Sequence, residues 1–189
     1  MPLPMEERYT LADALTWDES ERIELIFGIP VLMTPPLRIH QKILMTLARK
    51  IGLFLEGKKC EVYQAPFAVR LFEQAGDFPE QVDTMVEPDL SVVCDPDKLD
   101  DIGCKGAPDF IVEVLSPSTK RHDRVTKFNQ YQQAGVGEYW IVDPESQTVQ
   151  VFVLEDGHFR AVELYNADAV AEVNVLPGCL ISLSDVFST

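Results

Sequence analysis

Residues 108–119 read Pro-Asp-Phe-Ile-Val-Glu-Val-Leu-Ser-Pro-Ser-Thr, and the fold that we expect is built around this stretch. From Asp109 to Leu115 apolar residues stand on both faces, which is typical of a central strand that is covered on both sides. Glu113 breaks this pattern in the middle of the strand. A buried carboxylate costs several kcal/mol unless it is paired, protonated or bound to a cation. Glu113 is therefore the first candidate for a functional residue.

Patterns on either side of this strand predict further elements. A hairpin with its turn at Gly28 is expected at residues 21–33, and a helix after Pro35-Pro36 is expected to run to Glu56. Beyond it we expect a long strand at 60–71 that is interrupted or bulged at Pro66, an acidic loop or frayed hairpin at 72–86, a strand at 89–94, a helix at 121–134, strands at 138–142, 148–154 and 158–164, and a short helix at 182–187.

These elements indicate one domain of mixed composition. Strands dominate and two helices are long, so the sequence predicts an α+β (mixed α/β) fold. The chain has 189 residues, and it shows neither an internal repeat nor a linker rich in Gly, Ser or Pro. Residues 1–189 are therefore expected to form a single domain.

The net charge of −15 comes from 31 acidic and 16 basic residues. As a global value it argues against a non-specific binder of nucleic acid or of anionic membranes. The charge is unevenly distributed, because residues 38–59 carry a net +5 and residues 116–131 a net +3, whereas residues 72–101 carry −9. The basic segments are either ordinary solvated helix faces or a phosphate-facing surface on an acidic body.

The remaining composition favours a soluble cytoplasmic protein without a membrane partner. No apolar run approaches the ~18 residues of a membrane span, and the first residues do not form a signal peptide. The four cysteines are widely separated and form no C-x-x-C pair, so a zinc cage is not expected. Buried, reduced thiols are the expectation for all four.

A second acidic residue suggests a metal site together with Glu113. Asp89 follows Pro88 and opens another β-rich run. Two carboxylates on neighbouring strands offer the oxygen ligands that Mg²⁺ (or Mn²⁺) takes beside waters and substrate phosphates. The alternatives are that Asp89 caps a turn or the start of a strand and that Glu113 forms a salt bridge with a buried lysine or arginine.

Three further residues complete the candidate site. Lys127, in the helix after the Glu113 strand, could orient or deprotonate an attacking water, although it could equally be a solvated helical lysine. Glu24 is a possible third acid or an exposed residue of the hairpin. His40 could contact substrate or could simply belong to the first turn of the long helix.

At these residues the chain resembles a known family. The phrases that carry the resemblance are Glu24 to Gly28 followed by His40, Pro88 to Leu90, Pro108 to Thr119, Asp123 with Lys127 and Tyr131, and Gly135 to Pro144. Over roughly residues 11–164 they resemble the bacterial Uma-type "putative restriction endonuclease" family of the PD-(D/E)XK nuclease superfamily. The resemblance implies a restriction-endonuclease-like core at about 11–165, which is a central mixed sheet flanked by helices. In one departure, Leu115 stands where the superfamily has its lysine, and the role falls to Lys127.

We therefore expect an Mg²⁺-dependent endonuclease that hydrolyses phosphodiester bonds of nucleic acid, with DNA as the expected partner. The alternative is a catalytically inactive nuclease-fold module that binds DNA or protein. A homodimer is expected because small nucleases of this type pair two sites for two strands. The expected catalytic residues are Asp89, Glu113, Lys127 and Glu24, of which Asp89 and Glu113 would bind the metal, and the expected substrate contacts are His40, Lys120, Arg121, Arg124 and Tyr131.

Overall fold

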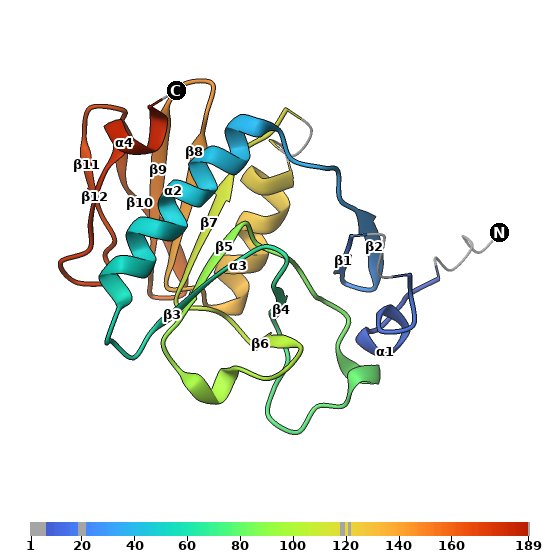
Figure 1. Ribbon diagram of the computed structural model, residues 1–189. Coiled ribbons are helices and arrows are strands. Elements are labelled where there is room, and N and C mark those ends of the chain that lie inside the picture. The colour runs from blue at the N-terminus through green and yellow to red at the C-terminus, as the bar shows by residue number, and fades with distance from the viewer. Residues whose placement is uncertain (1–6, 19–21, 118–119, 121, 189) are drawn as a thin grey trace.

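The computed structural model describes residues 7–18, 22–117, 120 and 122–188 (Figure 1). Its centre is a sheet of six strands in the order β10-β9-β8-β7-β5-β3. The strands are β3 (Glu61–Gln64), β5 (Leu90–Val93), β7 (Phe110–Val114), β8 (Glu138–Asp143), β9 (Thr148–Glu155) and β10 (His158–Asn166). Strand β7 is parallel to β8 and antiparallel to β5, so the sheet is mixed. The predicted α+β fold with a central mixed sheet is confirmed.

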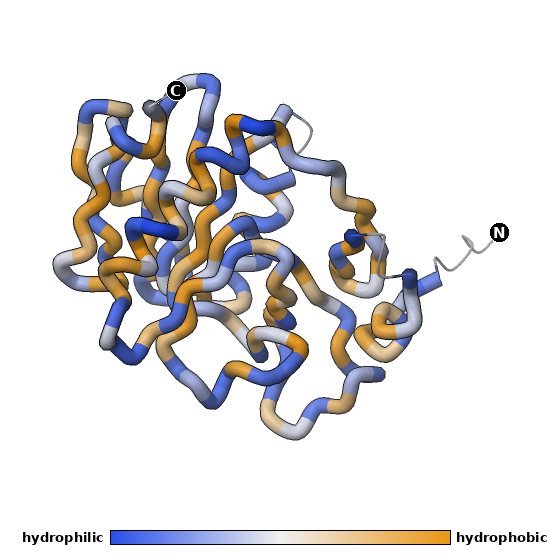
Figure 2. The backbone as a smooth tube through the Cα atoms, in the orientation of Figure 1, coloured by the Kyte–Doolittle hydropathy of each residue, from blue (hydrophilic) through white to orange (hydrophobic). Residues whose placement is uncertain are grey.

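Helices cover both faces of this sheet (Figure 1). Helix α2 (Arg38–Leu55) and the short α4 (Leu183–Phe187) pack on one face, and α3 (Phe128–Ala134) packs on the other. In β7, Phe110, Val112 and Val114 join the apolar cluster of α2, whereas Ile111 and the following Leu115 join that of α3. The apolar character of β7, which only Glu113 interrupts and which appears mostly in orange in Figure 2, therefore reflects burial on both sides.

Smaller elements surround the sheet. Strands β1 (Ile23–Ile26) and β2 (Ile29–Leu32) form the predicted hairpin, and Phe27 and Gly28 at its tip both have positive φ, as a type I′ turn requires. The other short elements are α1 (Leu11–Ala14), 3-10 helices at Pro79–Gln81 and Pro96–Lys98, the strand pair β4 (Ala68–Arg70) and β6 (Gly103–Lys105), and the pair β11 (Val170–Glu172) and β12 (Leu180–Ser182). No helix in the described ranges is both long and apolar enough to cross a membrane.

The expected long strand at residues 60–71 is two strands in different sheets. Strand β3 pairs with β5 in the main sheet, and β4 leaves it to pair with β6. Pro66, which has no N–H to donate, lies in the interruption between them. The pairing of β4 with β6 depends on Gly103, because a Cβ atom there would lie 2.1 Å from the carbonyl oxygen of Ala68.

The expected helix at residues 121–134 is also divided. Residues His122–Lys127 form a π-helical stretch, and α3 continues from Phe128 to Ala134. Gly135 ends the helix in the left-handed conformation with a φ of 92°. Because π-helical turns occur often at functional sites, the division draws attention to Asp123 and Lys127.

The cysteine prediction is half wrong. Cys104 and Cys179 are buried free thiols, as expected, but Cys60 and Cys94 form a disulfide. In the antiparallel pair of β3 and β5, Glu61 faces Val93, so the next residues outward, Cys60 and Cys94, face each other. The two cysteines are 34 residues apart in the sequence, so the sequence alone did not predict that they meet. The register of the two strands brings them together.

One buried carboxylate ties the sheet to the C-terminal segment. Glu138, at the start of β8, has no exposed surface and accepts hydrogen bonds from Trp140 Nε1 (2.6 Å), Asn174 Nδ2 (3.1 Å) and the Val175 amide (2.9 Å). Burial raises the pKa of Glu138, and these donors oppose that rise. The carboxylate therefore satisfies three donors that the fold has removed from water.

Replacing Glu138 with alanine is expected to destabilise the fold by about 2–4 kcal/mol, because buried donors would lose their acceptor. Glu138→Gln should cost less, since the amide keeps one acceptor oxygen. Urea denaturation of both variants and of the wild-type protein measures the difference. A loss below about 1 kcal/mol for Glu138→Ala would show that the hydrogen bonds at Glu138 are not needed for stability.

Candidate active site

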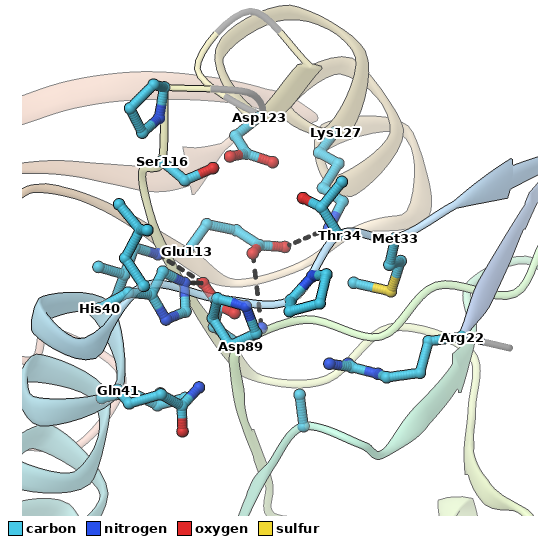
Figure 3. Close-up of a pocket in the computed structure, with 17 residues that line it drawn as sticks. Arg22, Met33, Thr34, His40, Gln41, Asp89, Glu113, Ser116, Asp123 and Lys127 are labelled. Atoms are coloured by element: carbon cyan, nitrogen blue, oxygen red, sulfur yellow. Dashed lines mark hydrogen bonds and ion pairs between the residues drawn. The ribbon is translucent and has the colours of Figure 1, made fainter. Parts of the chain in front are cut away.

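A cavity of about 370 Å³ opens where β7 ends (Figure 3). Its walls come from the first turns of α2, the segment between the hairpin and α2, the start of β5, and the residues that follow β7. The polar side chains in these walls are Arg22, Thr34, His40, Gln41, Asp89, Glu113, Ser116, Asp123 and Lys127. The cavity therefore collects charged groups from segments that are far apart in the sequence.

The register of the sheet brings Asp89 to Glu113. Leu90 of β5 faces Val112 of β7, and one residue further along this antiparallel pair Asp89 reaches the level of Glu113. The Asp89 amide lies 3.5 Å from Glu113 Oε2. The two carboxylates that the sequence suggested as a pair thus lie next to each other at the edge of one cavity (Figure 3).

Asp89 is held by a histidine and by the backbone. Its Oδ2 atom lies 2.9 Å from His40 Nε2 and accepts a hydrogen bond of 2.7 Å from the amide of Val114. An ionised carboxylate can only accept, so Nε2 carries the hydrogen in the pair with His40. His40 is 6% exposed and comes from the first turn of α2. Asp89 therefore has a fixed orientation before any ligand arrives.

Glu113 is buried against the helix on the other face of the sheet. Its Oε1 atom lies 3.0 Å from Lys127 Nζ and accepts a hydrogen bond of 2.6 Å from the Tyr131 hydroxyl. Burial raises the pKa of Glu113 well above its usual value; Lys127 opposes this rise, and the negative charges of Asp89, Asp123 and Glu24 add to it. Burial and the neighbouring negative charges thus outweigh the effect of Lys127 on the pKa of Glu113.

Lys127 is shared by two carboxylates. Its Nζ atom lies 2.9 Å from Glu24 Oε1 and 3.0 Å from Glu113 Oε1, and the residue is only 3% exposed. Burial lowers the pKa of Lys127, but the charges of Glu113, Glu24 and Asp123 outweigh that effect and raise it well above its usual value. These surroundings favour the protonated form of Lys127, which can stabilise negative charge.

The charges around the cavity do not balance. Asp89, Glu113 and Asp123 line it, and Lys127 pairs with Glu113 and with Glu24 behind it. The other cation in the wall, Arg22, is 2.6 Å from Glu87. A hard cation would offset this excess, and carboxylate oxygens are ligands that Mg²⁺ takes. Within the described ranges, no group of three or more His, Cys, Asp or Glu side chains is arranged to hold a metal ion. A cation here would thus need waters or substrate oxygens to complete its ligands.

Five of the candidate residues come together. Asp89, Glu113, Lys127 and His40 line the cavity, and Glu24 contacts Lys127. Glu24 is not an exposed residue of the hairpin and Lys127 is not a solvated lysine, because each residue is nearly completely buried. Both of these alternatives are therefore wrong. The salt bridge suggested as an alternative for Glu113 does exist, and it is made with Lys127.

The expected substrate contacts are placed differently. Tyr131 is fully buried, and its hydroxyl is bonded to Glu113, so the expectation that it touches substrate needs correction. Lys120 and Arg124 lie outside the cavity and pair with acids, Lys120 with Glu145 at 2.8 Å and Arg124 with Asp143 at 3.5 Å. Arg121 lies outside the described residues. These basic residues were expected from charge alone, which does not reveal their partners.

Five polar residues of the cavity wall were not named as candidates, although two of them, Ser116 and Asp123, stand in the phrases that carry the family resemblance. The five are Arg22, Thr34, Gln41, Ser116 and Asp123. Asp123 is 3% exposed and comes from the π-helical stretch that also carries Lys127. Its spacing of four residues from Lys127 was the available signal, because residues so spaced lie on one side of a helix. Ser116 follows β7 directly, and nothing in its local sequence distinguishes it from an ordinary loop serine.

The fold is shared with a solved structure. A protein from Anabaena variabilis ATCC 29413, described as "a putative nuclease belonging to DUF820", matches with a TM-score of 0.74 and 20% identity, over 95% of this chain and 98% of that one. Leu115, which stands where a lysine is common in the superfamily, lies in the apolar cluster under α3, while Lys127 approaches Glu113 from the helix above the same face.

The chain belongs to the Uma2 family, described as "Putative restriction endonuclease", whose model matches residues 9–184. An uncharacterized protein of Synechocystis sp. (strain PCC 6803) is 27% identical over 145 residues, which cover 75% of this chain and 72% of that protein. Family and fold together support a nuclease.

Glu24 provides a test of the buried ion pairs by pH. Burial alone would raise its pKa, but Lys127, His122 and the Glu87 amide lower it from 4.5 to about 2. The charged form therefore stabilises the fold above the usual pKa, and this contribution is lost as the pH falls through 4.5 towards 2. Relative to Glu24→Gln, the wild-type protein should be more stable by roughly 3 kcal/mol near neutral pH.

Urea denaturation of both proteins over a series of pH values measures this difference, which should shrink as the solution becomes acidic. Glu56→Gln, at an exposed glutamate beside the end of α2, serves as the control and should leave stability unchanged. A stability difference for Glu24→Gln that does not vary with pH would contradict the assignment of a low pKa to Glu24.

Proposed function

We propose that this protein is an Mg²⁺-dependent endonuclease that hydrolyses phosphodiester bonds of nucleic acid, with DNA as the substrate. The observation that carries the proposal is the convergence of Asp89, Glu113 and Lys127 in one cavity of a nuclease-like fold. Two neighbouring carboxylates beside a charged lysine are suited to a phosphate group and a divalent cation.

Asp89 and Glu113 would hold the cation. The donor set fits, since both supply hard oxygen ligands and the surrounding acids leave the cavity with too little positive charge. When bound, Mg²⁺ supplies a Lewis acid that polarises the phosphate and lowers the pKa of a coordinated water. A serine, Ser116, and a third acid, Asp123, also face the cavity and could orient waters there.

The remaining residues act by position and charge. Lys127 presents a fixed positive charge next to Glu113, where it would stabilise the negative charge that develops on the phosphate during attack. Glu24 holds Lys127 from the hairpin side, and Tyr131 fixes the orientation of Glu113 from below. His40 keeps Asp89 aimed at the cavity. In the protonated form that its surroundings favour, Lys127 would act through its charge.

Mutation of either proposed metal ligand is expected to abolish metal binding. Asp89→Ala and Glu113→Ala should each abolish the binding of Mn²⁺ or Mg²⁺ measured by isothermal titration calorimetry, because each removes one of two protein ligands. Glu138→Gln alters another buried carboxylate, at the opposite end of β8 from the cavity, and should bind metal like the wild-type protein. Unchanged metal binding in both alanine variants would refute the site.

Cleavage distinguishes this proposal from its main rival. The rival is a nuclease-fold module that binds DNA or protein without catalysis, and the net charge of −15 and Leu115 favour it. Single-stranded, duplex and branched DNA are incubated with Mn²⁺, using Glu113→Ala as the control. We expect cleavage that is lost in the variant, whereas binding without turnover would support the inactive module.

The homodimer remains part of the proposal. Two copies would place one site on each strand of a duplex, which is a common solution for a small nuclease. Sedimentation velocity of the purified chain tests the assembly separately from activity. A monomer that cleaves would remove the dimer from the proposal and leave the active site intact.

A further inference from the structure

A second cavity, which we call the side cavity, adjoins the candidate active site. It has a volume of about 540 Å³ and lies between the start of α2, the loop after β7 and the turn from β8 to β9. Leu37, His40, Ser116 and Pro117 line both cavities. The two cavities therefore share part of their walls and lie next to each other.

The walls of the side cavity are apolar and one end is polar. The apolar residues are Leu37, Ile39, Leu115, Pro117 and Pro144. At the polar end, Lys120 Nζ lies 2.8 Å from Glu145 and 3.3 Å from Asp143. Apolar walls combined with a donor and two acceptors suit a nucleobase, because its faces are apolar and its edge carries both donors and acceptors.

The start of α2 forms the border between the side cavity and the candidate active site. Leu37 and His40 line both cavities, and His40 also holds Asp89 through its Nε2 atom. The first turn of α2 contains no acidic residue, so it adds no negative charge at this border.

We propose that the side cavity binds one unpaired nucleotide of the nucleic-acid substrate, with its base between the apolar walls. This inference rests on the proposed function, since the neighbouring phosphodiester would then lie in the candidate active site. Lys120 would donate to the base edge, and Asp143 and Glu145 would accept from its amino groups.

The proposal specifies the substrate class. A base that is stacked and paired inside a duplex cannot enter a cavity of this kind, so it must first be extruded at a cost of a few kcal/mol. Single strands, loops and ends offer unpaired bases without that cost. The protein is therefore expected to prefer single-stranded or locally unpaired DNA over a continuous duplex of the same sequence.

A covalent plug tests the side cavity directly. Glu145→Cys places a thiol at its mouth for reaction with N-ethylmaleimide, and Ser146→Cys places one in the same exposed turn but outside the cavity lining. The two native free thiols do not interfere, because Cys104 and Cys179 are buried and burial raises the pKa of each to about 11. Modification therefore reports on the introduced thiol alone.

The readout is the dissociation constant of a fluorescent single-stranded oligodeoxynucleotide, measured with Ca²⁺ in place of Mg²⁺ and again with EDTA. Modification of Glu145→Cys should weaken binding about tenfold, and modification of Ser146→Cys should leave it unchanged. An abasic oligomer of equal length should bind the unmodified protein about tenfold more weakly and should be insensitive to the plug.

Three outcomes would overturn the proposal: no binding of the single strand, equal loss for both oligomers after modification, or no effect of modification at all. The endonuclease proposal is judged separately by metal-dependent cleavage and its loss in Glu113→Ala. Cleavage that persists unchanged after the side cavity is plugged would reject the nucleotide subsite and keep the nuclease. Base-dependent binding without cleavage would keep the subsite and reject the enzyme.

Discussion

The ammonium group of Lys127, held between Glu24 and Glu113, is the interaction on which the site depends. It joins three segments, because Glu24 comes from β1 of the hairpin, Glu113 from the central strand β7, and Lys127 from the helical segment that covers that strand. Carboxylates in such an interior are tolerated only when they are paired. Without Lys127, two buried carboxylates would face each other, and a change of that kind commonly costs several kcal/mol. Stability and the geometry of the site are therefore linked at one residue.

The second constraint is the register of the central sheet. The antiparallel pairing of β5 with β7 sets Asp89 beside Glu113, and the start of α2 on the opposite face supplies His40 to hold Asp89. Glu113 and Leu115 point to the face of α3, since successive side chains of a strand alternate. A lysine two residues after Glu113 would lie on that face, and Lys127 reaches the same place from above it. Two different positions in the chain can thus supply the same charge to the same carboxylate.

Local patterns predicted much of this structure. Hydrophobic periodicity predicted the hairpin, α2 and the central strands, and a charged residue within an apolar strand pointed to the acidic pair. Both signals are properties of residues that are close together in the sequence. The errors concern contacts between distant segments. Residues 60–71 divide between two sheets, Cys60 meets Cys94 across a strand pair, and Tyr131 lies beneath Glu113 instead of at the surface. The substrate roles of Lys120 and Arg124 stay predictions, and charge counting did not show the acids that pair with them.

The sequence by itself determined the class of fold, the strand that carries Glu113, and the two carboxylates proposed to hold a cation. These follow from which side chains tolerate burial and from chemistry that each residue carries with it. Only the tertiary structure decided that Glu24 and Glu113 share one buried lysine, that Asp123 lines the same cavity as Glu113, and that a second cavity adjoins the first. The reason is physical, because pKa, charge balance and cavity shape arise from distances between segments, and local sequence does not encode these distances.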